Sequence, residues 1–346
     1  MSKPKVGIIN VTGYAGVELA RLLYQHPQVE LTSVTGRSAA GQKLGEVFPH
    51  LASMDLTIEA KLRDVDLAFS AMPHQASAKE VIPLLNHGIK VVDISADFRL
   101  KNAAEYQSWY GFTHSAPQLL EQAVYGLTEL HRSQVASTQL VANPGCYPTG
   151  AILALAPAVK EDLIEPDIII DSKSGVSGAG RTPSLRAHYS EANEDVTAYA
   201  LEGHRHLPEI IQELGLLHPG KSLSVTFVPH LIPMTRGILT SCYAPLPPGK
   251  VAAGKKGEEE VRKLYLDFYK DEPFIKIVEF PPHTKHTWGN NLCLIHPTID
   301  HRTGRLIIIS CLDNLVKGAA GQAIQNMNLM LGLPEVTGLE ALAIYP

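Results

Sequence analysis

One of the four cysteines in this 346-residue chain lies among turn-forming residues. Cys146 is part of NPGCYPT, residues 143–149, and the apolar, helix-prone run GAILALAPAV follows it. Cys242, Cys293 and Cys311 lie instead in apolar runs typical of core strands, where cysteine behaves as a small hydrophobic residue. The amino end of a helix lowers the pKa of a thiol, and the thiolate is the reactive form. The setting of Cys146 therefore predicts a catalytic nucleophile.

A glycine turn near the start of the chain indicates a phosphate-binding site. The apolar run at 6–10 reads as a strand, and VELARLLYQHP, residues 17–27, has a helical apolar face. VTGYAG lies between them, where backbone N–H groups and the positive end of a helix would face a phosphate. Asn10 stands where such patterns have their first glycine, and asparagine tolerates a positive φ better than most residues. The residues expected to bind the cofactor here are Thr12, Gly13, Tyr14, Ala15 and Gly16.

Further apolar runs alternate with helical stretches through the first half of the chain. Such alternation predicts a doubly wound parallel sheet of the α/β class. In that fold a dinucleotide binds at the carboxyl ends of the strands, and the end of the second strand selects which dinucleotide. The runs that read as strands are 29–35, 65–72, 90–95 and 139–144.

The residues after the second expected strand favour NADP over NAD. NAD-binding chains place an acidic residue about 20 residues beyond the glycine turn, where it contacts the ribose hydroxyls. This chain has Gly36, Arg37 and Ser38 there. Because a guanidinium and a hydroxyl suit a 2′-phosphate, we expect Arg37 and Ser38 to bind NADP. The alternative is a surface arginine in a loop.

The position of the cysteine suggests a reaction class. Cys146 follows the strand expected at 139–144, which would place it at the sheet edge where a nicotinamide arrives. Backbone N–H groups there can receive the oxyanion that forms when the thiolate attacks a carbonyl. A thiol beside a nicotinamide indicates acyl transfer to sulfur coupled to hydride transfer. The alternative is a cysteine that lies in a Pro/Gly turn by chance.

The segment 191–210 contains candidate acid–base groups. His204, His206 and Glu209 lie just before or within an expected helix start. Glu209 is three positions after His206 and is spaced to orient its ring, and histidine titrates nearest to neutral pH. His204, two residues away, would point to another side of the helix. His206 is therefore the predicted acid–base group, and a solvated histidine pair is the alternative.

Strand patterns dominate the remainder of the second half. They predict a mixed or antiparallel sheet in an α+β substrate domain. The glycine-rich stretch 172–184, which contains Arg181, is a candidate part of the site, and a flexible loop is the alternative. Residues 313–333 are expected to form a helix that could return to the first domain. The runs that read as strands are 222–232, 237–246, 274–280, 291–299 and 305–312.

The composition predicts a soluble globular protein with small-molecule partners. The formal net charge is −5, 19% of the residues are charged and there is no block of Lys and Arg, which argues against nucleic acid and anionic membranes as partners. No apolar run suits a signal peptide or a membrane span, so we expect a cytoplasmic protein. The cysteines lack CxxC spacing, which argues against a disulfide framework or a metal site.

The chain resembles the N-acetyl-γ-glutamyl-phosphate reductases of arginine biosynthesis nearly from end to end. The resemblance implies a Rossmann-type NADP domain, residues 1–146 and 314–346, interrupted by an α+β catalytic and dimerisation domain, residues 147–313. Two features depart from the family pattern, namely Asn10 and the sequence HTKHTWGNN at 283–291. The resemblance rests on TGYAG, ISADFR, VYGLTEL, ANPGCYPT, SGVSGAGR, EANEDV, GHRHLPEI, PHLIPMTRGIL and DNLVKGAAGQAIQNMNLML.

The same resemblance implies the reaction and further site residues. N-acetyl-γ-glutamyl phosphate would be reduced by NADPH to N-acetylglutamate semialdehyde and phosphate, through a thioester on Cys146. Arg99, in ISADFR, would bind the phosphate by charge-assisted hydrogen bonds. Arg181 and His204 would contact the substrate and Asn326 the cofactor. A homodimer or homotetramer, built through the sheet of the second domain, is also implied.

Three other functions compete with this one. Aspartate-semialdehyde dehydrogenases share the fold and the thiol chemistry, but they carry a histidine directly after an Arg-Gly pair, and here Ile238 follows Arg236 and Gly237. Reductases of the one-carbon-longer aminoadipyl phosphate of lysine biosynthesis tend to depart from ANPGCYPT, which this chain keeps. A non-catalytic NADP sensor would not need a cysteine, a histidine and an arginine together.

Overall fold

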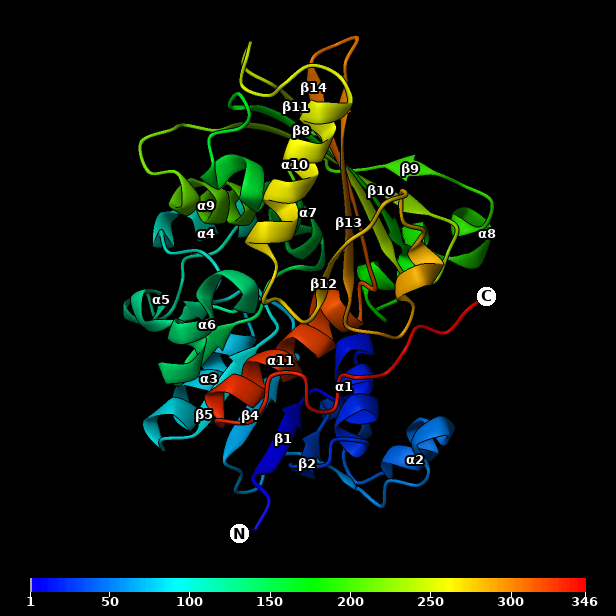
Figure 1. The fold of residues 1–346 in the computed structure, drawn as a ribbon. Coiled ribbons are helices and arrows are strands. Elements are labelled where there is room, and N and C mark those ends of the chain that lie inside the picture. Colours follow the sequence, from blue (N-terminus) through cyan, green and yellow to red (C-terminus); the bar gives the residue numbers. More distant parts are fainter. Residues whose placement is uncertain (1) are drawn as a thin grey trace. The chain divides into compact units, whose positions relative to one another are not determined.

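The computed structural model describes residues 2–346, which divide into two compact units. Residues 2–145 and 319–341 form the first unit, and residues 146–318 and 342–346 form the second. Figure 1 shows the chain in the colours of its sequence, with the helices and strands of each unit labelled.

The unit boundaries differ from those expected from the sequence. Cys146, residues 314–318 and residues 342–346 belong to the second unit. Hydrogen bonds explain why residues 314–318 and 342–346 belong to the second unit. The N–H of Gly318 donates to the Asp313 carbonyl over 2.9 Å. The N–H of Ile344 likewise donates to the carbonyl of Trp288 over 2.9 Å.

The first unit is built on a seven-stranded parallel sheet with the order β3-β2-β1-β4-β5-β7-β6. This order, which reverses direction at β1, confirms the expected doubly wound sheet. Its central strands are buried on both faces, as the continuous apolar runs require. The strands are β1 (Lys5–Ile9), β2 (Glu30–Thr35), β3 (Ile58–Glu59), β4 (Leu67–Ser70), β5 (Lys90–Asp93), β6 (Val124–Tyr125) and β7 (Leu140–Ala142).

Helices connect these strands and pack on the sheet. Helix α11 (Gly321–Met330) returns to this unit and contacts α1 (Tyr14–Tyr24), α6 (Thr128–Ser137) and β5. The remaining helices are α2 (Leu44–Val47), α3 (Ser77–Asn86), α4 (Ala103–Tyr110) and α5 (Gln118–Gln122), with short 3₁₀ turns at Arg37–Ala39 and Pro49–Leu51.

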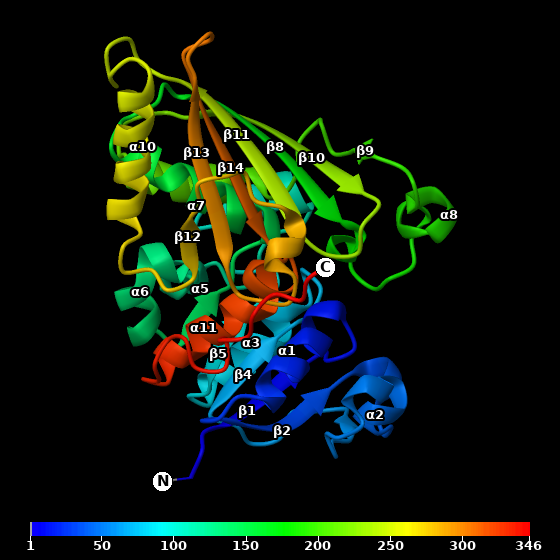
Figure 2. The ribbon, with the colours of Figure 1, turned by 45° about the vertical axis from the view of Figure 1, so that its right-hand side comes forward.

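The second unit contains a seven-stranded mixed sheet with the order β12-β13-β14-β11-β8-β10-β9. The pairs β8–β10 and β12–β13 are parallel and the other pairs are antiparallel. This confirms the expected α+β fold. The strands, which Figure 2 shows side by side, are β8 (Asp167–Gly175), β9 (Thr197–Ala198), β10 (Ser224–Ile232), β11 (Ile238–Pro245), β12 (Ile275–Ile277), β13 (Cys293–Asp300) and β14 (Arg305–Leu312).

Helices cover one face of this sheet. Helix α7 (Cys146–Lys160) packs on β11 and β14, α9 (Leu207–Leu217) on β10, and α10 (Lys255–Phe268) on β13. Strand β14 shows that the two faces of the sheet differ in burial. Leu306 and Ile308 point to one face and are buried, whereas Ile307 and Ile309 point to the other face and are half-buried. Short turns complete the unit: 3₁₀ turns at Val176–Ala179, Leu185–Ala187 and Thr284–Thr287, and helix α8 (Tyr189–Ala192).

Two segments differ in local structure from what the sequence indicated. The flexible loop that was the alternative for 172–184 does not apply to its first four residues, because they end strand β8, which pairs with β10 and β11. The single helix expected over 313–333 begins with a π-helical segment at Val316–Ala320 before α11. Sheet partners distant in sequence explain the first difference, since no local pattern separates an edge loop from a paired strand.

Candidate active site

The glycine turn of the first unit has the backbone that a dinucleotide requires. Asn10 takes φ = 64°, as its position in the pattern led us to expect, and its amide Nδ2 donates to the Ala71 carbonyl over 2.9 Å. A Cβ on Gly16 would lie 2.6 Å from the Asn10 carbonyl oxygen, so only glycine allows this close packing. A Cβ on Gly13 would meet nothing nearer than 3.8 Å, which leaves the turn open to a phosphate.

The other residues expected in this turn lie at its surface. Tyr14 is 40% exposed and is the first residue of α1, with Gly13 as the N-cap. Ala15 is half-buried. The hydroxyl of Thr12 donates to Oδ1 of Asn10 over 3.3 Å. Because α1 is 11 residues long and Gly13 has no side chain to cap it, the N–H groups of its first turn remain available to an anion.

A cavity of about 290 Å³ adjoins this turn at the carboxyl ends of β1, β2 and β4. Asn10, Gly36, Arg37 and Ser38 line it, as the expected position of the cofactor requires. Arg37 also forms an ion pair with Glu80 of α3, with 3.1 Å between Nη2 and Oε1. The residues present therefore fit a dinucleotide with its adenosine end near Arg37.

Arg99 is buried and holds two strand ends together. Its Nε donates to the Asn143 carbonyl and its Nη2 to the Ile94 carbonyl, both over 2.8 Å. Ile94 follows β5 and Asn143 follows β7, so this guanidinium fixes the chain three residues before Cys146. Phosphate binding by Arg99 stays a prediction beside this structural role.

Asn326 of α11, which the resemblance places at the cofactor, is held by hydrogen bonds within the first unit. Its side chain is fully buried, its Oδ1 accepts from the Thr128 hydroxyl over 2.8 Å, and its Nδ2 donates to the Gly126 carbonyl over 2.8 Å and to Oδ1 of Asn143 over 3.0 Å. Both N–H donors of the amide are therefore used within the first unit. Asn326 therefore positions Asn143, and its contact with the cofactor stays a prediction.

Cys146 is the first residue of α7 in the second unit, so the expected cysteine-then-helix arrangement is present. Its side chain is partly exposed, whereas Cys242, Cys293 and Cys311 are buried, as expected of core cysteines. Burial raises the pKa of Cys311 to about 12, and it raises the pKa of Cys242 further. Among these four thiols, Cys146 is the one with access to a substrate.

The π-helical segment Val316–Ala320 packs closely against Cys146. A Cβ on Gly318 would lie 2.9 Å from the Cβ of Cys146, so a glycine is needed here for the segment to pass this close to the cysteine. π-Helical turns are frequent at functional sites. The sequence expectation of one continuous helix did not include this feature.

His204 and His206 contact each other, which corrects the expectation that they face different sides of a helix. Helix α9 begins at Leu207, so that His206 is its N-cap residue and His204 precedes it. The two rings are 4.8 Å apart in a T-shaped arrangement, and both contact the ring of Tyr147. The helical periodicity applied in the sequence argument does not hold before the helix starts.

The two histidines nevertheless have different chemistry. Nδ1 of His204 accepts the backbone N–H of His206 over 3.1 Å, so the neutral ring carries its proton on Nε2. Burial, with the charge of Arg205 as a smaller cause, lowers the pKa of His204 to about 4. His204 is therefore neutral at physiological pH and is fixed as a donor at Nε2, which leaves His206 as the better candidate for proton exchange.

Glu209 is fully buried in the first turn of α9, three residues after His206. A carboxylate is favourable at this end of a helix. Arg181 follows the 3₁₀ turn at Val176–Ala179 and is exposed. The contacts of Glu209 with His206 and of Arg181 with substrate stay predictions.

Two tyrosine hydroxyls form a hydrogen-bonded chain, and one of them belongs to Tyr147, which is next to Cys146 in the sequence. The Tyr199 hydroxyl donates to the Tyr147 hydroxyl over 3.2 Å, and the latter donates to the His230 carbonyl over 3.1 Å. Burial raises the pKa of both tyrosines, and the proximity of Cys146 raises each pKa further. Both phenols therefore stay protonated, and Tyr147 anchors the first turn of α7 to β10.

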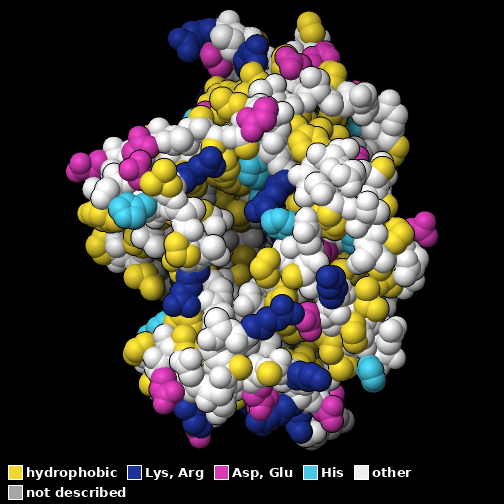
Figure 3. Space-filling view, turned by 180° about the vertical axis from the view of Figure 1, so that it is seen from behind, with side chains coloured by type: hydrophobic (Ala, Val, Ile, Leu, Met, Phe, Trp, Pro, Cys, Tyr) yellow, Lys and Arg dark blue, Asp and Glu magenta, His cyan; other side chains and the backbone are white. Residues whose placement is uncertain are grey.

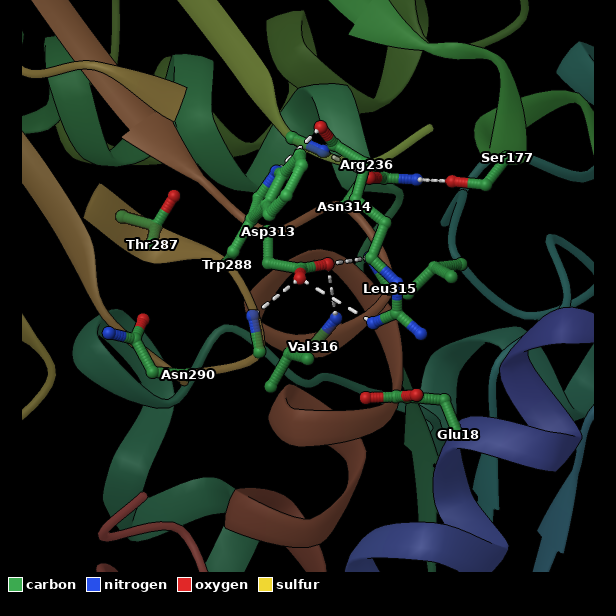
Figure 4. Close-up of polar contacts among 12 residues, drawn as sticks. Glu18, Ser177, Arg236, Thr287, Trp288, Asn290, Asp313, Asn314, Leu315 and Val316 are labelled. Carbon is green, nitrogen blue, oxygen red and sulfur yellow. Dashed lines mark hydrogen bonds and ion pairs between the residues drawn. The ribbon is translucent and has the colours of Figure 1, made fainter. Parts of the chain in front are cut away.

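Sequence reasoning missed a polar cluster around Asp313 (Figure 4). The buried Asp313 carboxylate accepts the backbone N–H groups of Gly289 and Leu315, both over 2.8 Å, and that of Val316 over 3.2 Å. Nη1 of Arg236 lies 3.5 Å from the same carboxylate. The cluster fixes the start of the π-helical segment. The sequence feature that could have indicated this cluster is Asp313 in DNLV, residues 313–316.

Three further features concern the surface, metal ligands and membrane-spanning helices. On the face drawn in Figure 3, basic and acidic side chains are dispersed among apolar and neutral polar ones. Within residues 2–346, no group of three or more His, Cys, Asp or Glu side chains is arranged to hold a metal ion. Over the same residues, no helix combines the length and apolar character needed to cross a membrane.

Family models match both halves of the chain. The model for the semialdehyde dehydrogenase NAD binding domain matches residues 5–138, and that for the semialdehyde dehydrogenase dimerisation domain matches residues 146–314. An N-acetyl-gamma-glutamyl-phosphate reductase from Dehalococcoides mccartyi is 60% identical over 100% of both chains, and one from Pelotomaculum thermopropionicum is 50% identical over 99% of both. The chain belongs to the N-acetyl-gamma-glutamyl-phosphate reductase family.

Solved structures agree on the fold. Aspartate semialdehyde dehydrogenase II from Vibrio cholerae has a TM-score of 0.70 at 15% identity, covering 96% of this chain and 99% of that one. Aspartate semialdehyde dehydrogenase with NADP from Candida albicans has a TM-score of 0.70 at 14% identity, covering 95% and 99%. At this identity the similarity shows the fold alone.

Membership of this reductase family confirms the expected enzyme class. The chain is an oxidoreductase of the semialdehyde dehydrogenase type that uses a nicotinamide cofactor. It acts on a small molecule and carries a dimerisation domain. A non-catalytic sensor is therefore no longer a competing function.

Proposed function

We propose that this protein reduces N-acetyl-γ-glutamyl phosphate to N-acetyl-L-glutamate 5-semialdehyde and phosphate in arginine biosynthesis, with NADPH as the cofactor, in the cytoplasm. The full-length identity to reductases of that name carries this proposal. The Cys146 thiol, which is partly exposed at the start of α7, supports catalysis through a thioester. Gly318 lets the π-helical segment lie close beside it.

The Cys146 thiolate attacks the acyl carbon of the substrate. The C–S bond forms as the C–O bond to phosphate breaks, so phosphate leaves and a thioester remains on Cys146. NADPH, when bound, supplies the hydride that reduces this thioester. The C–S bond then breaks, which releases the semialdehyde and returns the electron pair to sulfur.

Protein groups hold the substrate and move the proton. His206 exchanges the proton with the oxygen of the thiohemiacetal, and Glu209 orients the His206 ring. His204 presents its Nε2–H to the substrate, because its Nδ1 is already used by the His206 backbone. Arg99 and Arg181 bind the phosphate and the anionic part of the substrate.

Arg37 and Ser38 would hold the 2′-phosphate that distinguishes NADPH from NADH. Both line the cavity beside the glycine turn, and the guanidinium is a strong phosphate partner. The N–H groups at the start of α1 would hold the pyrophosphate.

The half-buried face of the second sheet would be the contact surface of a homodimer. Two such dimers would form a homotetramer. Ile169, Leu239 and Ile307 share that face, because β11 pairs Tyr243 with both Ile169 and Ile307 and Leu239 lies four residues before Tyr243. Asp171 and Lys173 of β8 lie on the same face and form an ion pair, so the face combines apolar side chains with charged ones. Such a mixed, half-buried face suits a two-fold contact with the same face of a second copy. Sedimentation of the purified protein tests this, and a monomer at working concentration would contradict it.

The substrate is tested with the reverse reaction. The purified enzyme is given NADP, phosphate and either N-acetylglutamate semialdehyde or its one-carbon-longer homologue, and NADPH formation is followed by absorbance. We expect phosphate-dependent turnover with the first and a much lower kcat/KM with the second. A preference for the longer homologue would instead assign the aminoadipyl-phosphate reaction.

A further inference from the structure

Arg37 faces an acidic residue in the cavity beside the glycine turn. Arg37 begins the 3₁₀ turn that follows β2, and Glu80 lies in the first turn of α3. The Arg37 Nη2 and the Glu80 Oε1 are 3.1 Å apart, and both residues line the cavity. Among the described residues that line it, these two are the charged ones. The cavity therefore contains one cation already paired with one anion.

The position of Glu80 is fixed by the start of α3. The Asp97 carboxylate accepts the backbone N–H groups of Gln75 over 2.8 Å and Ala78 over 3.0 Å, which caps this helix. The Ser77 hydroxyl donates to Asp93 over 2.6 Å and ties the same turn to β5. A carboxylate in the first turn of a helix is stabilised in its ionised form by the helix dipole. Glu80 therefore presents a negative charge from a rigid element.

The pair is weak enough to be exchanged. The Arg37 side chain is 83% exposed and that of Glu80 is 41% exposed, and ion pairs this exposed contribute little to stability. A 2′-phosphate that binds Arg37 must take the guanidinium from Glu80, and it then lies near a second negative charge. A 2′-hydroxyl meets no such repulsion and finds in Glu80 an acceptor for its proton.

We propose that Glu80 determines cofactor specificity in this enzyme by lowering its preference for NADPH over NADH. It does so by competing with the 2′-phosphate for Arg37 and by accepting a hydrogen bond from the ribose of NADH. This inference rests on the cofactor site proposed above, with Arg37 as the phosphate ligand. It adds to that site a residue whose effect opposes that of Arg37.

Binding of both cofactors to Glu80→Gln tests the proposal. Dissociation constants for NADPH and NADH are measured by fluorescence titration on the purified full-length enzyme without substrate. We expect NADPH to bind about two- to fivefold more tightly and NADH less tightly by a similar factor, so that their ratio changes about fourfold or more. Glu121→Gln on α5 is the matched control, because it removes the same charge from an exposed residue of the same unit that does not line the cavity.

The variant Arg37→Ala separates the two proposals. If Arg37→Ala leaves NADPH binding unchanged, the cofactor assignment itself is wrong. If Arg37→Ala weakens NADPH while Glu80→Gln gives the same NADPH to NADH ratio as the wild type and Glu121→Gln, the role of Glu80 is overturned and the cofactor site stands. A shift of the ratio toward NADH in Glu80→Gln would also overturn it.

Discussion

The two units of this reductase are both built on seven-stranded sheets, but their sheets serve different purposes. In the first unit every strand pair is parallel, so all the carboxyl ends meet at one edge, where the glycine turn and the Arg37 cavity lie. In the second unit the sheet is mixed and one face is covered by helices. The groups that we propose to be reactive lie at the starts of helices α7 and α9. On this proposal the parallel sheet supplies a binding edge and the helix starts supply the chemistry.

The units also bury titratable groups with opposite consequences. Burial raises the pKa of Asp93 in the first unit to about 6, although Ser77 and Ser95 donate hydrogen bonds to its carboxylate. Burial lowers the pKa of His204 in the second unit to about 4. Both shifts favour the neutral form, but one group then gains a proton on folding and the other loses one.

If the chemistry belongs to the second unit, Cys146→Ser should cause the largest effect. We expect turnover to fall by at least about 10³-fold, because the serine hydroxyl has no comparable nucleophilicity, while NADPH still binds through the first unit. Mass spectrometry after mixing the enzyme with acyl phosphate, without NADPH, should show an adduct on the wild type and none on the variant. An unmodified wild-type Cys146 under active conditions would exclude the thioester.

The histidine pair sharpens the comparison within the second unit. His206→Asn should lower kcat by about 10² to 10⁴, the usual contribution of general acid–base catalysis, with little change in the Kd of NADPH. His204→Asn should cost much less, since His204 is neutral and its Nδ1 is occupied by the His206 backbone. If His204→Asn is the more damaging variant, the two assignments must be exchanged.

The pH dependence of unfolding should differ in sign between the two groups. The folded pKa of Asp93 lies above the usual 3.8, so its contribution to stability falls as the pH rises from about 4 to about 6. The folded pKa of His204 lies below 6.5, so its contribution is lost as the pH falls from about 6.5 to about 4. Each effect amounts to about 3 kcal/mol at most, at 1.36 kcal/mol per pKa unit.

Urea denaturation of Asp93→Asn and His204→Asn across this pH range tests the two signs. Asp93→Asn should remove the decrease in the free energy of unfolding as the pH rises from about 4 to about 6. His204→Asn should remove the increase in the free energy of unfolding as the pH rises from about 4 to about 6.5. If both variants change the slope in the same direction, burial does not set the pKa of one of the two groups.

Arg37→Ala should give the smallest of these effects and should act on cofactor binding alone. A charge-assisted contact is worth about 1.5 to 3 kcal/mol, so NADPH should bind about one to two decades more weakly while NADH changes far less. Titration of both cofactors measures the difference. Equal losses for NADPH and NADH would show that Arg37 serves the fold of the loop after β2.

Patterns that are local in the sequence predicted most of the fold. The alternation of apolar runs and helical stretches identified the longer strands of the first sheet, and the strand patterns of the second half identified β10 to β14. The setting of Cys146 identified the start of α7. The two-residue strands β3, β6 and β9 were missed because so short a run carries no periodicity. Strand β8, an interior strand of the second sheet, was missed altogether, and the serine and glycine residues at its carboxyl end are typical of loops.

The sequence by itself determined which residues could bind a phosphate or act as a nucleophile, because a glycine turn or a cysteine before a helix is defined within a few residues. Tertiary structure decided which of them meet. The pairing of Arg37 with Glu80, the hydrogen bonds of Asn326 to Asn143, and the close approach of Gly318 to Cys146 join residues 43 to 183 positions apart. Such contacts arise when separate elements pack together, and no periodicity or spacing along the chain encodes them.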